Sequence, residues 1–396
     1  MPAISRSTMT TQIEERLFTR NQIMEEYFTH DAKRLADASR EMSERFLRGG
    51  RLLAFGRGPC ATDAQHVSVE FVHPVIAGKR ALPALDLSLS FRPWLETILG
   101  SEDIVMGFGP PEGDPQVESA LAGARMRDAM TFALPGREGS FPLEPPTDDP
   151  FIHQELVEVL YHALWETVHV FFEHRELGHE AGESEFLYPF LGKQKQKTQD
   201  VLAQVAASIL MKARDDSELR VRVARESADR IGSSARAIDE RLKRGGKLIV
   251  FGNGGSATGA NDLVLDCVQP PAGWRPVSAV SLAMEPANIT AVANDVGPDL
   301  IFLRQLIALG RTGDVAVAIS TSGGSRNIVM ALEEARRRNM LTVALLGCDG
   351  GEVVRQGLAD FPIVVHCDYI PRIQEVQTSI YHVMREMLEV ISRGQA

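Results

Sequence analysis

Short apolar runs of strand length alternate with longer amphipathic stretches through the second half of the chain. The runs are KLIVF from residue 247, VSAVSLA from 277, DVAVAI from 314, LTVALL from 341 and FPIVV from 361. Because polar and apolar positions do not alternate within them, we expect strands buried on both faces of a parallel sheet. Stretches 13–46 and 198–242 place apolar residues three and four apart and predict long helices. The pattern predicts a three-layer α/β fold with helices on each side of the sheet.

The chain repeats itself. GGRLLAFGRGPCATDAQHVSVE begins at Gly49, and GGKLIVFGNGGSATGANDLVLD begins at Gly245. Nearer the end of each half, a glutamine is followed eight residues later by a histidine, as Gln154 with His162 and as Gln374 with His382. Two matched segments in the same order predict a tandem duplication, with domains at residues 1–192 and 193–396. Two unrelated domains that share a loop are the alternative.

Two polar loops follow strands of the second copy. GNGGSA begins at residue 252 and STSGGS at residue 320, and each precedes a helical pattern. Glycines let the backbone approach a ligand, and N–H groups at a helix start favour an anion. In the second loop, four hydroxyls and two glycines at the carboxyl end of a strand can surround a phosphate with neutral donors. A serine-rich turn that only caps a helix is the alternative.

The first copy departs from this pattern. GPPEGD, at residues 109–114, stands in place of the hydroxyl loop. Its two prolines lack N–H donors and its two carboxylates repel an anion. We therefore expect that the first copy does not hold phosphate in this way.

A set of polar side chains distinguishes the first copy. His66 and Glu70 are four residues apart and share one helix face, and Gln154 and His162 lie two turns apart on another helix. Their nitrogen and oxygen atoms suit Zn²⁺ or a similar divalent ion, or an acid/base pair. A structural histidine pair is the alternative. The second copy has Asp262, Asp266, Gln374 and His382 at the equivalent positions.

Together these segments resemble the sugar isomerase (SIS) domain family, specifically its phosphoheptose isomerase branch. The matching text is GNGGSA, STSGGS, ATDAQHVSVE from residue 61, ALPALDL from 81, TAVAND from 290, and IQEV with its following histidine. The resemblance implies two tandem three-layer αβα SIS domains. Each would be a doubly wound parallel sheet of flavodoxin-like order with N-terminal helices.

The resemblance also implies an activity, the interconversion of sedoheptulose 7-phosphate and D-glycero-D-manno-heptose 7-phosphate through an enediol. The phosphate contacts fall on Ser256, Ser320, Thr321, Ser322 and Ser325, with Asn253 in the neighbouring loop. Further substrate contacts fall on Gly254, Glu285 and Gln374. The acid/base pair falls on Glu70 and His162 in the first copy and on Asp266 and His382 in the second. We assign the base to His162 and the acid to Glu70, with the reverse open. The Zn²⁺ ligands fall on His66, Glu70, Gln154 and His162, and no nucleotide cofactor is implied.

Some expected residues are missing. The resemblance implies an arginine four residues after Glu70 in the first copy and after Asp266 in the second, but the chain has Pro74 and Pro270 there. It also implies an aspartate three residues before each glutamine, where the chain has Phe151 and Pro371. Because the second copy keeps the phosphate loops and the first copy keeps the metal or acid/base groups, we expect a composite site between repeats or between chains. A self-sufficient second copy is the alternative. Since the resemblance implies tetramers of single-domain chains, we expect a homodimer of tandem chains.

Charge and composition narrow the other classes of function. The chain has 42 Lys and Arg against 53 Asp and Glu, a net charge of −11, so nucleic acid is not an expected partner. Without a spanning apolar stretch or a secretory signal, we expect a cytoplasmic protein with no membrane partner and a small sugar phosphate as its ligand. A non-catalytic sugar-phosphate sensor or a protein-interaction regulator is the alternative function.

Overall fold

The structure is a computed structural model that describes residues 6–75, 79–176 and 198–394. It divides into two compact units, each described here by itself. The N-terminal unit is Gln22–Ser217, and the C-terminal unit combines Met1–Asn21 with Glu218–Ala396. The predicted domain boundary, between residues 192 and 193, lies outside the described residues.

Two long helices contribute to both units. They are α1 (Arg6–Leu47) and α7 (Thr198–Lys243), close to the helices predicted at 13–46 and 198–242. Met9, Ile13 and Leu17 of α1 belong to the core of the C-terminal unit, whereas Val201 and Val205 of α7 belong to the core of the N-terminal unit. The compact units are therefore not the two contiguous halves that the repeat suggests.

The N-terminal unit has a five-stranded parallel sheet in the order β2-β1-β3-β4-β5. Its strands are β1 (Leu52–Gly56), β2 (Ala84–Asp86), β3 (Ile104–Phe108), β4 (Met130–Leu134) and β5 (Phe141–Pro142). Besides α1, its helices are η1 (Gly58–Cys60), α2 (Ala61–Val72), α3 (Phe91–Ile98), α4 (Pro115–Arg125) and α5 (Pro150–Glu176).

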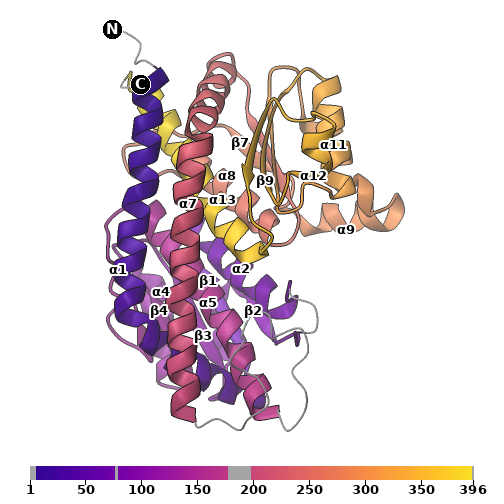
Figure 1. Cartoon of the computed structure of the whole chain (residues 1–396). Helices are drawn as coiled ribbons and strands as arrows, with labels where there is room; N and C mark the ends of the chain where they lie inside the picture. The colour runs from indigo at the N-terminus through magenta and orange to yellow at the C-terminus, as the bar shows by residue number, and fades with distance from the viewer. Residues whose placement is uncertain (1–5, 76–78, 177–197, 395–396) are drawn as a thin grey trace. The chain divides into compact units, whose positions relative to one another are not determined.

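The C-terminal unit repeats this topology, in the order β7-β6-β8-β9-β10. Its strands are β6 (Leu248–Gly252), β7 (Ala279–Ser281), β8 (Val315–Ser320), β9 (Leu341–Gly347) and β10 (Phe361–Val365). Its helices are α8 (Gly255–Val268), α9 (Pro286–Asp295), η3 (Pro298–Leu300), α10 (Ile301–Leu309), α11 (Arg326–Arg337), α12 (Gly351–Arg355) and α13 (Ile370–Ser392) (Figure 1). The shared strand order supports the predicted duplication and is the flavodoxin-like doubly wound order.

Each sheet separates two apolar cores. In β6, Leu248 and Val250 pack with α8 and α13, whereas Ile249 and Phe251 pack with α10 and α11. Alternate residues of β1 face two cores in the same way. The predicted three-layer αβα fold with two domains is therefore confirmed. The central strands β6, β8 and β9 are fully buried as predicted, but the edge strands β7 and β10 are partly exposed because each lacks a neighbour on one side.

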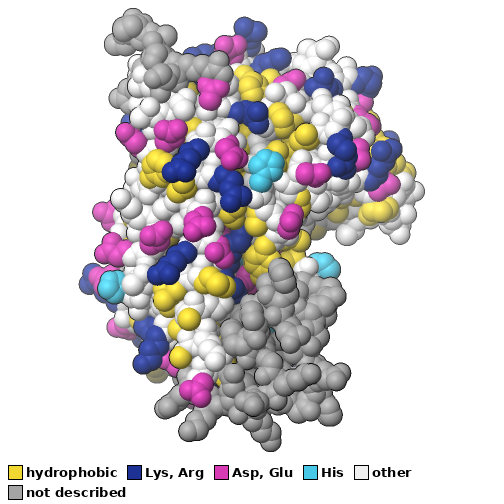
Figure 2. Space-filling view, in the orientation of Figure 1, with side chains coloured by type: hydrophobic (Ala, Val, Ile, Leu, Met, Phe, Trp, Pro, Cys, Tyr) yellow, Lys and Arg dark blue, Asp and Glu magenta, His cyan; other side chains and the backbone are white. Residues whose placement is uncertain are grey.

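The surface carries charges of both signs. On the face shown in Figure 2, basic side chains are interspersed with acidic ones and do not gather into one patch. Among the described helices, none is long and apolar enough to span a bilayer.

Candidate active site

The two predicted phosphate loops lie at the carboxyl ends of neighbouring strands. β6 pairs directly with β8, so the loops after Gly252 and Ser320 are side by side. The side-chain amides of Asn253 and Asn327 exchange two hydrogen bonds of 3.0 Å and join the first loop to the start of α11. Ligands of open α/β sheets bind at this edge, so the fold places these loops where an anion site is expected.

The hydroxyl groups of the second loop are arranged around its backbone. Ser320 Oγ accepts from Gly323 N at 3.1 Å, and Ser322 Oγ accepts from Gly324 N at 3.2 Å. Ser325 precedes α11, yet its side chain makes no capping hydrogen bond. The capping alternative therefore finds no support at Ser325, whose hydroxyl and the exposed Ser322 remain available for a ligand.

A tight backbone approach fixes the shape of this loop. Gly323 has a φ of +61°, and a Cβ atom at this position would stand 2.2 Å from Gly350 O. The amide of Val353 also donates to Gly323 O at 3.1 Å. Since a side chain cannot be accommodated, the loop conformation requires glycine at this position.

The other predicted substrate residues occupy varied surroundings. Ser256 is buried in the first turn of α8, Thr321 is half-buried, and Gly254 is exposed before α8 with a φ of +56°. Glu285 is exposed, and its carboxylate caps α9 by accepting from Ala287 N at 3.2 Å. Gln374 on α13 is buried, and its Oε1 has no hydrogen-bond partner among the described residues. That unpaired acceptor suits a hydroxyl ligand.

The predicted acid/base residues of the C-terminal unit lie together and are buried. His382 Nε2 is 3.2 Å from Asp266 Oδ2 and 3.4 Å from Asp262 Oδ2. The phenol of Tyr381 donates to Asp262 Oδ2 at 2.7 Å. Burial and the Asp262 charge raise the pKa of Asp266 to about 6, against the opposing effects of His382 and Arg385.

The raised pKa of Asp266 predicts a pH effect on stability. Because the folded pKa exceeds the unfolded value of about 3.9, this group contributes stability that is present at low pH and lost as the pH rises through 6. Asp266→Asn should not show this loss, so its free energy of unfolding should rise by about 1 kcal/mol relative to that of the wild type between pH 5 and pH 8. Urea unfolding at both pH values measures this free energy, with exposed Asp299→Asn as the control. Parallel pH curves for wild type and D266N would contradict the raised pKa.

The N-terminal unit gathers a different set of buried ionisable groups. His66 Nε2 is 3.6 Å from Glu70 Oε1, and its Nδ1 is 3.7 Å from Glu158 Oε1 and 3.0 Å from the Tyr161 hydroxyl. The rings of His66 and His162 have their centroids 5.0 Å apart. The Glu70 side chain is fully buried, and neither carboxylate oxygen receives a hydrogen bond from a described residue. An imidazole and a carboxylate in such contact can exchange or hold a proton.

Glu158 was not anticipated from the sequence. Ligand atoms of His66, Glu158 and His162 lie within 4.8 Å of one another. Glu158 stands four residues from both Gln154 and His162, so the helical spacing could have revealed it. Part of the Gln154 side chain makes other contacts: its amide nitrogen donates to Thr62 Oγ1 at 3.2 Å and to Asp63 Oδ2 at 3.1 Å.

The loop at residues 109–114 supplies its own anion. Asp114 caps α4 by accepting from the amides of Gln116 and Val117, and it also binds Arg57 Nη1 at 2.7 Å. Although burial opposes the effect, these hydrogen bonds hold the pKa of Asp114 below its usual range. A carboxylate thus sits at the helix N-terminus, and this agrees with the expectation that the first copy does not hold phosphate here.

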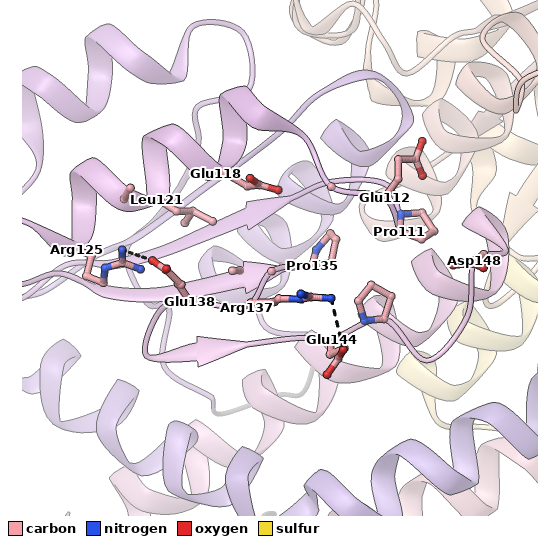
Figure 3. A pocket seen from close by; sticks show the side chains of 15 residues that line it. Pro111, Glu112, Glu118, Leu121, Arg125, Pro135, Arg137, Glu138, Glu144 and Asp148 are labelled. Carbon is pink, nitrogen blue, oxygen red and sulfur yellow. Dashed lines mark hydrogen bonds and ion pairs between the residues drawn. The ribbon is translucent and has the colours of Figure 1, made fainter.

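A pocket of about 600 Å³ lies beside this loop (Figure 3). Its ionisable residues are Glu112, Glu118, Arg125, Arg137, Glu138, Glu144 and Asp148. Both arginines contact carboxylates of the pocket, Arg125 with Glu138 at 2.6 Å and Arg137 with Glu144 at 3.9 Å. With five carboxylates against two guanidinium groups, the pocket disfavours a phosphate ligand.

Comparison with known proteins decides the family. The SIS domain model matches residues 214–347. The phosphoheptose isomerase of Geotalea daltonii is 40% identical over 168 residues, which are 42% of this chain and 86% of that protein. The corresponding enzyme of Akkermansia muciniphila is 42% identical over 156 residues, 39% of this chain and 82% of that protein. The chain belongs to the SIS domain family.

Solved structures agree with the SIS fold over the whole chain. The C-terminal domain of glucosamine-fructose-6-phosphate aminotransferase from Francisella tularensis has a TM-score of 0.61 at 9% identity and covers 96% of both chains. Tagatose-6-phosphate ketose/aldose isomerase from Escherichia coli has a TM-score of 0.55 at 14% identity, covering 100% of this chain and 97% of that one. At such identities the likeness shows the fold alone, and with the phosphoheptose isomerase relatives it confirms the resemblance seen in the sequence.

Proposed function

We propose that this SIS protein is a phosphosugar isomerase that interconverts an aldose and a ketose, with sedoheptulose 7-phosphate as its substrate. The observation that carries the proposal is the pair of joined loops after β6 and β8, which present hydroxyl and N–H donors beside two helix N-termini. Identity of about 40% to phosphoheptose isomerases supports the same substrate class.

Phosphate binding would rest on local donors. At a net charge of −11 the chain gains nothing from long-range attraction of a dianion. The hydroxyls of Ser322 and Ser325 and the amides at the starts of α8 and α11 are neutral donors that hold an anion without a buried cation. Gln374, with its unpaired buried oxygen, would accept a hydrogen bond from a sugar hydroxyl.

The proton transfer would use a histidine and a carboxylate in contact. One group removes a proton from the carbon beside the carbonyl, an enediol forms, and a proton returns to the neighbouring carbon. In the C-terminal unit these groups are His382 and Asp266, 3.2 Å apart. In the N-terminal unit they are His162 and Glu70, which both lie beside His66. Both carboxylates are buried beside an imidazole, Glu70 at 3.6 Å from His66 and Asp266 at 3.2 Å from His382, and neither oxygen of Glu70 receives a hydrogen bond from a described residue.

A divalent ion such as Zn²⁺ fits the N-terminal cluster. The donor set consists of the buried imidazoles and carboxylates of His66, His162, Glu70 and Glu158, which are groups that Zn²⁺ accepts. Neither oxygen of Glu70 receives a hydrogen bond from a described residue, so this carboxylate has acceptor capacity left for an ion. When bound, such an ion supplies a positive charge that holds the open sugar or stabilises negative charge on its oxygens.

The assembly and place of action form part of the proposal. The homodimer of tandem chains and the cytoplasmic location rest on the resemblance to tetrameric relatives and on the sequence. The alternative, a sugar-phosphate sensor without catalysis, keeps the same loops but needs no proton transfer.

Incubation of the protein with sedoheptulose 7-phosphate tests the function. We expect aldoheptose phosphate to accumulate, with Zn²⁺ supplied or removed by a chelator in parallel samples. Fructose 6-phosphate, a shorter ketose phosphate, serves as the specificity control. Binding of the heptose phosphate without product under every condition would favour the sensor.

Ser325→Ala separates a phosphate ligand from a helix cap. Because the hydroxyl makes no capping bond, its loss should leave the unfolding free energy within about 0.5 kcal/mol of wild type. Loss of one hydrogen bond to a charged phosphate should raise KM about tenfold or more. Urea unfolding and steady-state kinetics measure the two effects. Loss of stability of about 1 kcal/mol with unchanged KM would assign Ser325 to capping instead.

A further inference from the structure

Two cysteines meet at the carboxyl edge of the C-terminal sheet. Cys348 directly follows β9, and Cys367 stands two residues after the end of β10. These two strands are paired, with Gly347 opposite Val365, so their loops leave the sheet side by side. The amide of Cys348 donates to the carbonyl oxygen of Cys367 at 3.1 Å. The two cysteines are therefore hydrogen-bonded neighbours although they are distant in the sequence.

The backbone geometry of this pair suits a disulfide bond. Standard bond lengths and the hydrogen bond of 3.1 Å keep the two Cα atoms within about 7 Å, and most disulfides join Cα atoms about 4.4–6.8 Å apart. Both side chains also pack against the same apolar core, on the side of the sheet that α8 and α13 cover. Cys367 Sγ accepts from the Tyr369 amide at 3.4 Å, and rotation of the side chain towards Cys348 would give up this weak bond.

The two thiols differ from the remaining cysteine of this unit in their exposure. Cys348 and Cys367 are partly exposed, so a small solute can reach them, whereas Cys267 is buried. Burial, together with the charges of Asp368 and Asp349, raises the pKa of Cys348. Because the thiolate is the attacking form, Cys348 is the slower thiol to react with an oxidant. The first attack is therefore assigned to Cys367.

We propose that Cys348 and Cys367 are a redox site, a dithiol that a low-molecular-weight disulfide oxidises to an intramolecular disulfide. The thiolate of Cys367 attacks one sulfur of the small disulfide, forms a mixed disulfide and releases one small thiol. The thiolate of Cys348 then attacks the Cys367 sulfur, closes the protein disulfide and releases the second small thiol. The small disulfide takes up the two electrons that the protein thiols lose, and the released thiols carry the two protons.

The cysteine pair lies behind the loop after β8. A Cβ atom on Gly347, which precedes Cys348, would stand 2.4 Å from Thr321 O, and a Cβ atom on Gly323 would stand 2.2 Å from Gly350 O. The segment after β9 is thus in close backbone contact with the loop after β8. Closing the disulfide ties this segment to the end of β10, and it thereby restrains the loop that carries the predicted phosphate ligands.

Treatment of the reduced full-length protein with an excess of oxidised glutathione tests the pair. Proteolysis without a reducing agent, followed by mass spectrometry, should recover two peptides joined through Cys348 and Cys367, and dithiothreitol should separate them. Cys348→Ser should instead keep one glutathione on Cys367, because the thiol that resolves the mixed disulfide is missing. Cys60→Ser is the control, since it removes a cysteine of the other unit and should form the cross-link as the wild type does.

Amide hydrogen exchange tests the link to the loop after β8 without substrate. Exchange at residues 320–325 should slow in the oxidised wild type and should not slow in Cys348→Ser treated in the same way. Wild-type protein that carries only glutathione adducts, or that keeps both thiols reduced, would overturn the pair, and this result does not depend on the folding of any variant. Unchanged exchange at 320–325 in the cross-linked protein would overturn the link to the loop. Neither readout uses isomerase activity, so its absence bears on the proposed function alone.

Discussion

Glu70→Gln is expected to lower kcat for the heptose phosphate by about 10²- to 10⁴-fold, the range that a positioned acid or base contributes. Glutamine keeps the shape of the side chain but cannot carry a proton between carbon atoms. The Glu70 carboxylate is fully buried beside His66, and neither of its oxygens accepts a hydrogen bond from a described residue. A buried group with unused acceptors is suited to receive a proton from a ligand.

Asp266→Asn is the matched change in the C-terminal unit, and the smaller loss of kcat is expected there. Asp266 contacts His382 at 3.2 Å, and its raised pKa leaves it partly protonated near pH 6. Because Glu70 also lies 3.6 Å from His66 in the cluster proposed to hold the metal, the metal content of Glu70→Gln must be measured, and kcat must be compared at saturating Zn²⁺. Full activity in Glu70→Gln together with inactivity in Asp266→Asn would assign the proton transfer to the C-terminal pair.

The strands and long helices were predictable because their signals are local. Continuous apolar runs such as 314–319 and 341–346 became the fully buried strands β8 and β9. The run at 277–283 gave only the short, half-buried β7, since an edge position depends on strand order, which no single run encodes. The apolar stripe of α1 showed that the helix is buried. It could not show that Met9 and Met24 belong to different cores.

The candidate site was predictable where the two copies could be compared. The contrast between STSGGS and GPPEGD indicated which copy keeps anion donors, and the carboxylate of Asp114 at the start of α4 gives the physical reason. Glu158 escaped notice because the repeat offers Thr378 at that position, so comparison of the copies gave no sign of a shared ligand. Spacing within α5 places Glu158 on the face of Gln154 and His162, but its approach to His66 on α2 is a tertiary contact that no spacing encodes.

Gly323→Ala is expected to remove phosphosugar turnover by distorting the loop after β8. The new Cβ atom would stand 2.2 Å from Gly350 O, so one of the two backbone segments has to move. The positive φ adds a cost of about 1–2 kcal/mol for a residue with a side chain. Displacement of the neighbouring Ser322 and Ser325 by about 1 Å should lower kcat/KM by about 100-fold or more, because positioning errors of that size have such effects.

Gly324→Ala is the control for this experiment, since it adds the same methyl group one residue later. At Gly324 the nearest atoms to a Cβ are 3.9 Å away and the φ is not positive, so the unfolding free energy should stay within about 0.5 kcal/mol of wild type. If Gly324→Ala nevertheless weakens substrate binding, the methyl group meets the ligand itself, and the phosphate lies against the backbone at this residue. Wild-type kcat/KM in Gly323→Ala would instead show that the loop after β8 does not position the substrate.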